Sequence, residues 1–294
     1  PKESVDVLFK HYFPGAKRKY ENNIKYRNPE SPKTYVFDKT GPTMFNATKL
    51  KHAFKEFKNH KAPGPDGLKP IVLKNLDPKT LVRLAHIYEA CYKLAHTPDI
   101  LQESIIAFIP KPGKKEYTQC KSWRPITLLN FLFKGLEKVI LRYLQEIYGE
   151  QIQFSAQHAY TCGKSTETAM AEVVNYIEQT ALRNKHCYGT FLDISGAYNN
   201  APYKHITNSL KERKLCKDFI TFTDNFLHNR QTTIKIGKAR DTRTLIMGVS
   251  QGSILSCLLW NSYINPLLTS TNQIGIGKGG NKVLAYADDI ACLN

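Results

Sequence analysis

Apolar residues recur three to four positions apart along much of the chain, which is the spacing that places them on one face of a helix. The clearest case is Leu136, Val139, Ile140 and Leu144, which predict a long amphipathic helix. The same spacing predicts helices over these further ranges: 50–57, 79–95, 166–184, 203–213, 217–228 and 253–268. Residues 1–45 are polar and basic with little periodicity, and they predict a linker or a loosely ordered arm.

Short apolar runs between these helices predict strands. Residues 104–109 and 188–192 are two such runs, and residues 231–247 have the pattern of a hairpin. Near the end of the chain, Asp288 and Asp289 stand between two more apolar runs, which predicts a strand, a tight turn and a second strand. Because strands and helices mix without strict alternation, we expect an α+β fold.

Composition narrows the class of protein. The chain has 294 residues, of which 41% are hydrophobic, so it is a globular chain with one or two domains. Its net charge of +17 favours a polyanionic partner, nucleic acid first, although a merely basic soluble protein has such a charge too. Seven cysteines without any Cys-x-x-Cys pair indicate reduced thiols inside a cell. No run approaches the roughly 20 apolar residues of a membrane helix, and no signal peptide is visible.

Three acids are the candidates for chemistry. Asp193 ends the expected strand at 188–192, and Asp288 and Asp289 occupy the expected turn. Each acid alone also fits a solvated turn or a helix cap. Together they form a set of carboxylates on two strand ends, and the usual reason to crowd carboxylates is a hard cation such as Mg²⁺. Two such ions would suit an in-line phosphoryl transfer.

Six segments, in order, carry a resemblance to a known family. Residues 191–198 (FLDISGAY), 248–256 (GVSQGSILS) and 286–289 (YADD) resemble blocks of the reverse transcriptase domain of non-LTR, LINE-like retrotransposons of the Jockey type. Upstream, residues 61–67 (KAPGPDG), 109–114 (IPKPGK) and 122–126 (SWRPI) match further blocks. The resemblance covers residues 60–294.

The resemblance implies a right-hand polymerase with fingers and a partial palm, whose antiparallel sheet is backed by helices. It divides the chain into an N-terminal arm and helix at 1–59, fingers at 60–160 and a palm at 161–294. The chain stops at Asn294, just after the YADD segment. We therefore expect the thumb and a preceding endonuclease domain to be missing, and the isolated fragment to be inactive.

The resemblance also assigns roles to residues. Asp193, Asp288 and Asp289 would be the catalytic acids and, with the carbonyl of Ile194, the ligands of two Mg²⁺ ions, with Mn²⁺ as a substitute. Tyr198 would exclude a 2′-OH and so select deoxynucleotides; without the motif it fits a core tyrosine. The residues expected to contact the nucleotide are Lys111, Arg124, Gly196, Ala197, Tyr198, Gln251 and Gly252. Lys111 also fits a solvated basic face.

The implied function is an RNA-directed DNA polymerase that adds deoxynucleotides to a primer 3′-OH. Its partners would be an RNA template, a DNA primer, dNTPs and an element-encoded endonuclease domain, with no membrane. It would be intracellular, acting in the nucleus on nicked chromosomal DNA, with a cytoplasmic ribonucleoprotein as the other location. One alternative is a catalytically inactive nucleic-acid-binding remnant. Another is a group II intron maturase or a viral RNA polymerase, and Tyr198 argues against an enzyme that makes RNA.

Overall fold

A computed structural model describes residues 2–18, 44–273 and 282–294 of the chain. Its first half contains, in order, α1 (Lys2–Tyr12), β1 (Lys17–Arg18), α2 (Ala47–Lys55), α3 (Pro70–Lys74), α4 (Pro78–Lys93), α5 (Asp99–Gln102), β2 (Glu103–Pro110), β3 (Trp123–Leu129) and α6 (Phe131–Tyr148). Its second half contains α7 (Thr166–Leu182), β4 (Gly189–Asp193), α8 (Ala197–Asn200), α9 (Tyr203–Glu212), α10 (Lys217–His228), β5 (Gln231–Ile236), β6 (Ala239–Thr244), α11 (Leu255–Gln273), β7 (Lys282–Tyr286) and β8 (Asp289–Leu293).

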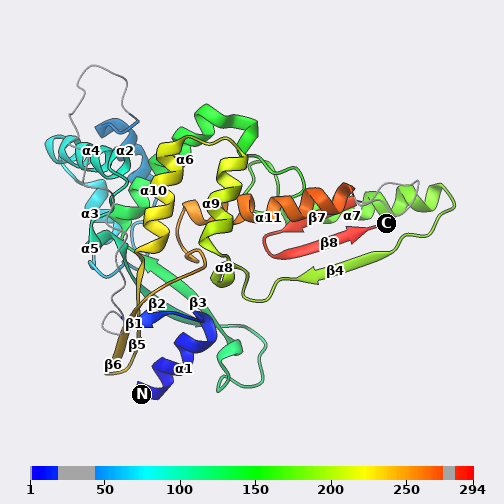
Figure 1. The fold of residues 1–294 in the computed structure, drawn as a ribbon, viewed down its shortest axis with the longest axis horizontal. Helices are drawn as coiled ribbons and strands as arrows, with labels where there is room; N and C mark the ends of the chain where they lie inside the picture. The colour runs from blue at the N-terminus through cyan, green and yellow to red at the C-terminus, as the bar shows by residue number, and fades with distance from the viewer. Residues whose placement is uncertain (1, 19–43, 274–281) are drawn as a thin grey trace.

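The strands form two sheets (Figure 1). The five-stranded sheet has the order β1-β6-β5-β2-β3, in which β2 and β5 are parallel and the other neighbours are antiparallel. The three-stranded sheet has the order β4-β8-β7 and is antiparallel throughout. The larger sheet joins strands from both sides of residue 160, so it does not follow the expected boundary between fingers and palm. That boundary stays a prediction.

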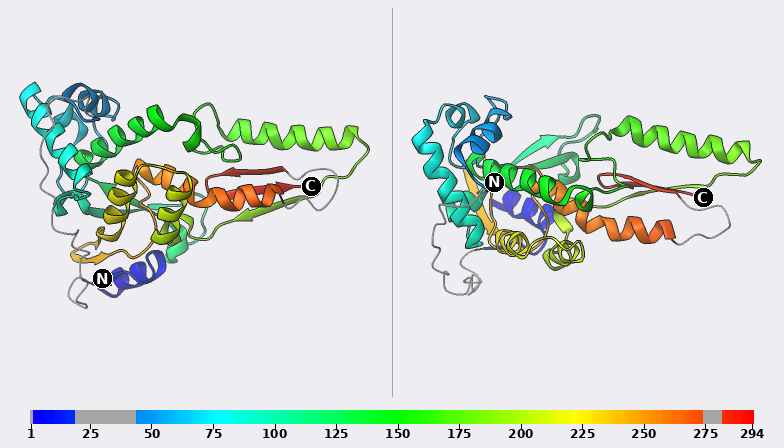
Figure 2. Two further views of the ribbon diagram at one scale, coloured as in Figure 1. Left: turned by 45° about the horizontal axis from the view of Figure 1, so that its top comes forward. Right: turned by 90° about the horizontal axis from the view of Figure 1, so that it is seen from above.

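Helices cover these sheets and supply the core. α7 and α11 lie on opposite sides of the three-stranded sheet, and both contact β7 (Figure 2). The main core includes the fully buried Phe133 and Leu136 of α6, Phe222 of α10 and Trp260 of α11. None of the described helices, the 19-residue α11 included, has the length and apolar character needed to cross a bilayer. The core thus ties α11, and the residues just before it, to α6 and α10.

Local sequence explains where the principal helices begin. The Asp77 side chain accepts hydrogen bonds from the backbone N–H groups of Lys79 and Thr80, and Pro78 takes the first helical position of α4. Ser165 and Thr168 form a reciprocal capping box at the start of α7. Such caps satisfy N–H groups that have no partner within the helix, and they add about 1 kcal/mol each. The predicted helices and the predicted strands all occur, with shifts of a few residues at their ends.

The expectation of a loose N-terminal arm was wrong for the residues described there. Residues 2–12 form α1, whose Val5 and Phe9 are buried in a small second core with Ile234 of β5. The Tyr12 hydroxyl donates to the carbonyl of Trp123 at 2.8 Å, which ties α1 to β3. Residues 19–43 of the expected arm lie outside the described residues. The sequence pattern did not predict α1, because the single apolar stripe of this helix covers only three turns.

The apolar run before Asp193 does not form a buried strand. β4 lies at the edge of its sheet, and all five of its residues are exposed. Phe191 keeps 72% of its surface exposed. No residue of the neighbouring α7 is buried either. Asp193 is thus not a buried carboxylate that needs a metal, and its role as a ligand depends on its neighbours Asp288 and Asp289.

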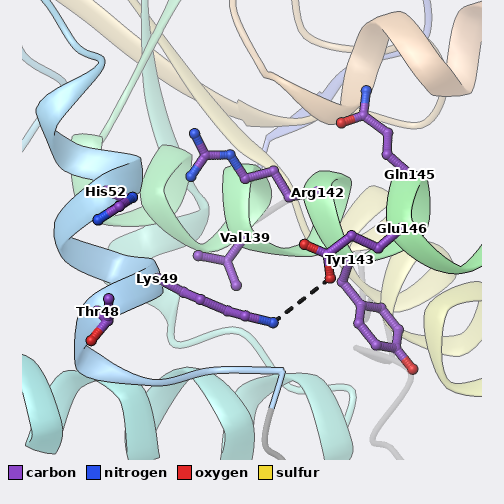
Figure 3. A pocket seen from close by; sticks show the side chains of 8 residues that line it. All are labelled: Thr48, Lys49, His52, Val139, Arg142, Tyr143, Gln145 and Glu146. Carbon is purple, nitrogen blue, oxygen red and sulfur yellow. Dashed lines mark ion pairs between the residues drawn. The ribbon is translucent and has the colours of Figure 1, made fainter.

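A surface pocket of about 550 Å³ lies between α2 and α6 (Figure 3). Lys49 reaches across it from α2 to form an ion pair with Glu146 of α6, at 3.8 Å. Arg142 also lines the pocket, and its guanidinium is paired with Glu56. None of the expected catalytic or nucleotide-contacting residues lines this pocket, so the candidate site lies elsewhere.

Candidate active site at the β7–β8 turn

Strand pairing brings the three acids together. Asp193, the last residue of β4, lies directly opposite Asp289, the first residue of β8. On the other side Tyr286 pairs with Asp289, so Ala287 and Asp288 form a two-residue turn. The side chains of directly opposed residues share one face of a sheet, with Cβ atoms about 5 Å apart. The end of the three-stranded sheet that lies nearer to the five-stranded sheet carries this turn (Figure 1).

The charges of the acids influence one another. The pKa of Asp288 is raised, mainly because the carboxyl is partly buried, and also because the negative charges of Asp289 and Asp193 disfavour its ionised form. The guanidinium of Arg124 acts in the opposite direction. Partly desolvated carboxylates that repel one another are the setting in which a bound cation lowers the free energy most.

The donor set fits a hard divalent cation in its chemistry, because carboxylate oxygens are the ligands that Mg²⁺ prefers. As they stand, however, the three side chains do not form a complete metal site. Among the residues that the structure describes, no three His, Cys, Asp or Glu side chains gather closely enough to hold an ion as they stand. The carbonyl of Ile194, expected as a ligand, accepts the N–H of Ala197 at 3.3 Å. The backbone thus places the acids side by side, while ligation requires their side chains to turn toward the ion.

The residues after Asp193 form a tight turn into α8. Gly196 has φ +61°, a left-handed conformation that glycine adopts without strain, and its carbonyl accepts the N–H of Asn199 at 2.9 Å. Ala197 and Tyr198 are buried. The Tyr198 ring stacks on Trp260, with ring centroids 5.3 Å apart, and meets the edge of Tyr160. Tyr198 is therefore packed against two aromatic rings, which restrict the movement of its side chain.

The glycines of the 248–256 segment allow close backbone contacts. Gly248 donates its N–H to the carbonyl of Ala201 at 2.7 Å, and a Cβ on Gly248 would lie 2.5 Å from the carbonyl oxygen of Asn199. A Cβ on Gly252 would lie 2.4 Å from the carbonyl oxygen of Thr127. Larger residues would push the segment away from α8 and β3. The segment is thereby held directly against α8, which carries Tyr198.

Gln251 and Gly252 lie in a turn before α11. α11 begins at Leu255. The carbonyl of Gln251 accepts the N–H of Thr127 at 2.8 Å, which connects the segment to β3, the strand of Arg124. Arg124 is exposed and close enough to Asp288 to affect its pKa. These contacts bring Arg124, Gln251 and the acids into one region.

Lys111 is not brought to the acids in the same way. It follows β2, where its N–H donates to the carbonyl of Ser122 at 2.8 Å and its carbonyl accepts the hydroxyl of Tyr117. Within residues 2–18, 44–273 and 282–294, no hydrogen bond or ion pair joins its side chain to Asp193, Asp288 or Asp289. The structure thus gives Lys111 less support than Arg124.

Two buried charged residues hold the 248–256 segment, and sequence reasoning missed both. Glu137 of α6 accepts hydrogen bonds from the Ser253 hydroxyl and, at 3.1 Å, from the N–H of Ile254. Burial raises the pKa of Glu137 to about 7. Arg230 donates to the Ser250 hydroxyl at 2.8 Å and to the Gly248 carbonyl at 2.6 Å. One signal was available for Glu137, because an acid interrupts the apolar stripe of the predicted helix; Arg230 gives no local signal.

Comparison with known proteins identifies the family of this chain. Residues 109–294 match the family described as Reverse transcriptase (RNA-dependent DNA polymerase). A probable RNA-directed DNA polymerase from transposon BS of Drosophila melanogaster is 28% identical over 82% of this chain and 27% of its own length. The polymerase from mobile element jockey of Drosophila funebris is 26% identical over 83% of this chain and 27% of its own. The chain therefore spans about a quarter of the length of these relatives.

A solved telomerase structure has a similar fold. Telomerase from Candida albicans, in a complex with the TWJ fragment of telomeric RNA, has a TM-score of 0.50 and 12% identity over 74% of this chain and 41% of its own. At that identity the likeness concerns the fold alone. The α+β arrangement is that of a right-hand polymerase, as the resemblance implied. Because the family match covers more than half of the residues, the chain belongs to the reverse transcriptase family, with relatives among the RNA-directed DNA polymerases of jockey and other non-LTR retrotransposons.

Proposed function

We propose that this chain carries the catalytic centre of an RNA-directed DNA polymerase of a non-LTR retrotransposon. The observation that carries the proposal is the register of β4 against β8, which sets Asp193 opposite Asp289 and beside Asp288 in the turn. Polymerases of this family depend on a divalent metal, and we propose two Mg²⁺ ions here, with Mn²⁺ as a substitute.

Asp193, Asp288 and Asp289 would hold the ions. When bound, the ions lower the pKa of the primer 3′-OH and stabilise the pyrophosphate that leaves. The carbonyl of Ile194 accepts the N–H of Ala197 and keeps a second lone pair with which it would join them. The chain's own contribution is to keep three carboxylates on one sheet end, where partial burial of Asp288 strengthens their attraction for a cation.

The nucleotide would lie between the acids and the 248–256 segment. Tyr198, pressed against Trp260, would face the sugar and exclude a 2′-OH. Arg124 would pair with triphosphate oxygens, for which a planar guanidinium is well shaped. Gln251, Gly252, Gly196 and Ala197 would contact the nucleotide through backbone and amide groups. Lys111 remains a candidate only if the loop that carries it moves toward the acids.

The partners and location follow from the proposed reaction. The RNA template and DNA primer would be held mainly through their phosphates, which suits the net charge of +17. The complete protein would carry an endonuclease domain and would prime synthesis in the nucleus on nicked chromosomal DNA. The expected fingers at 60–160 and palm at 161–294 remain parts of this proposal.

Primer extension on an RNA template tests the proposal. The longest natural protein that contains residues 1–294 should extend a DNA primer with dNTPs in Mg²⁺ and should not do so in EDTA. Ribonucleotides in place of dNTPs should give little product. Salt-sensitive binding of the primer–template without extension would instead identify a nucleic-acid-binding remnant, and efficient synthesis from ribonucleotides would identify an RNA polymerase.

A further inference from the structure

Ala287, the residue before Asp288, has an unfavourable backbone conformation. Its φ is +58°, on the first central position of the two-residue turn between β7 and β8. Glycine adopts this conformation freely, whereas a residue with a Cβ is destabilised by about 1 kcal/mol or more. A strained backbone persists only where its surroundings hold it. The position of Asp288 therefore depends on whatever holds Ala287.

The side chain of Gln157 forms hydrogen bonds with both backbone polar groups of Ala287. Its Oε1 accepts the N–H of Ala287 at 2.8 Å, and its Nε2 donates to the carbonyl of Ala287 at 3.1 Å. Only a side-chain amide of this length offers an acceptor and a donor side by side. The two residues are 130 positions apart in the sequence, so the contact is a tertiary one.

The amide of Gln157 is itself fixed. Gln157 is fully buried, with 0% of its surface exposed, and its Oε1 also accepts the N–H of Ala159 at 3.0 Å. The backbone on either side lies along β7, where the N–H of His158 donates to the carbonyl of Ala285 and the N–H of Ala285 donates to that of Ala156. We call the two hydrogen bonds between Gln157 and Ala287 the clamp. The clamp joins the β7–β8 turn to a segment that is itself hydrogen-bonded to β7.

We propose that Gln157 is a positioning residue for the metal-binding acids. By fixing Ala287 it sets the place of Asp288 relative to Asp193 and Asp289, without contacting ion or substrate. The inference rests on the proposed function for the identity of the ligands. Residues that orient metal ligands commonly change metal affinity by about ten- to a hundredfold when they are replaced.

The experiment compares Gln157→Met with Gln102→Met in the 294-residue chain. Gln102 is a matched control, because it is also buried and donates to a backbone carbonyl, that of Thr97 at 2.6 Å, far from the acids. Mn²⁺ binding is measured by electron paramagnetic resonance, and amide hydrogen exchange at Ala287 is measured by NMR without metal. Asp288→Asn establishes whether bound Mn²⁺ is held by the acids.

Gln157→Met should weaken the Mn²⁺ affinity by about tenfold or more and speed the exchange of the Ala287 amide. Gln102→Met should change neither, whatever its effect on unfolding. Adding Ala287→Gly to Gln157→Met should restore part of the affinity, since glycine needs no clamp at positive φ. A purely structural role for Gln157 would lower the unfolding temperature without this rescue.

Distinct results overturn the inference and the proposed function. If Mn²⁺ binding persists in Asp288→Asn, or is absent from the unmodified chain, the metal assignment fails. If Gln157→Met leaves both the Mn²⁺ affinity and the Ala287 exchange unchanged, the positioning role fails. Should Gln157→Met not fold, the unmodified chain decides: the Ala287 amide must exchange slowly, and rapid exchange there contradicts the clamp.

Discussion

The ring of Trp260 stacks on the ring of Tyr198, with the two planes 21° apart. The same indole donates its N–H to the carbonyl of Ala287 at 3.0 Å, and Trp260 is almost fully buried. One side chain of α11 therefore contacts both the expected sugar-selecting residue and the turn that carries Asp288. We therefore propose that selection of the sugar and placement of the acids are coupled through this side chain.

Replacing Trp260 with Leu should weaken discrimination against ribonucleotides. Tyr198 would lose the ring that keeps it in place, so it could yield to a 2′-OH. The measure is the ratio of kcat/KM for a dNTP to that for the matching NTP, which should fall in Trp260→Leu and fall further in Tyr198→Ala. Phe222→Leu, an equally buried change in α10, should leave the ratio unchanged. A ratio that is equal in all three variants would remove Tyr198 and its support from sugar selection.

Replacing Glu137 with Gln should remove a pH dependence of stability. The pKa of Glu137 is about 7 in the folded protein against an ordinary value of 4.5, because burial disfavours the charge although Ser253 and Lys134 favour it. A raised pKa means that the folded protein binds a proton at Glu137 more tightly than the unfolded chain does. The resulting stabilisation of the folded protein is complete below about pH 4.5 and is lost as pH rises to about 7, a change of roughly 3 kcal/mol.

Urea unfolding between pH 4.5 and 8 measures this effect. The unmodified chain should lose stability over that range, and Glu137→Gln should show a much flatter profile because an amide can serve Ser253 and Ile254 at any pH. Glu89→Gln, at another buried acid on α4, is the control and should keep the fall. The same fall in Glu137→Gln as in the unmodified chain would contradict the role assigned to Glu137.

Replacing Arg230 with Met should disturb nucleotide binding from a distance. The change leaves the Gly248 carbonyl and the Ser250 hydroxyl without their buried donor, which destabilises the protein by roughly 2–4 kcal/mol. Because Gln251 follows directly, KM for dNTPs should rise. Arg213→Met removes a different half-buried guanidinium, one that donates to Gln151 at 2.5 Å, and should leave KM unchanged. A normal KM in Arg230→Met would show that the segment holds its shape without this anchor.

Several elements could be predicted because each depends on local pattern. α9 and α10 follow apolar residues at helical spacing, and the turn at Asp288 follows two acids between apolar runs. β3 was not predicted, since Pro125 and the polar Thr127 interrupt a strand that is stabilised by pairing with β2. The exposure of β4 could not be predicted either, because an apolar run such as that around Phe191 usually indicates burial.

The acids of the site could be found from sequence, and their supports could not. Asp193, Asp288 and Asp289 belong to segments whose order is distinctive. Gln157 is an ordinary polar residue in an irregular stretch, and its importance appears only when the fold brings it to Ala287. Trp260 is similar, because the predicted apolar helix gives no sign that its indole N–H has a partner in the turn.

The central claim is that Asp193, Asp288 and Asp289 form the catalytic metal site, and one substitution tests it most directly. Asp288→Asn keeps the shape of the turn but removes one charge that a divalent ion needs. Primer extension on an RNA template should be lost in this variant. The control, Asp218→Asn, removes an exposed acid of α10 that is paired with Lys93 of α4 and should keep normal activity. Full extension by Asp288→Asn would contradict the account.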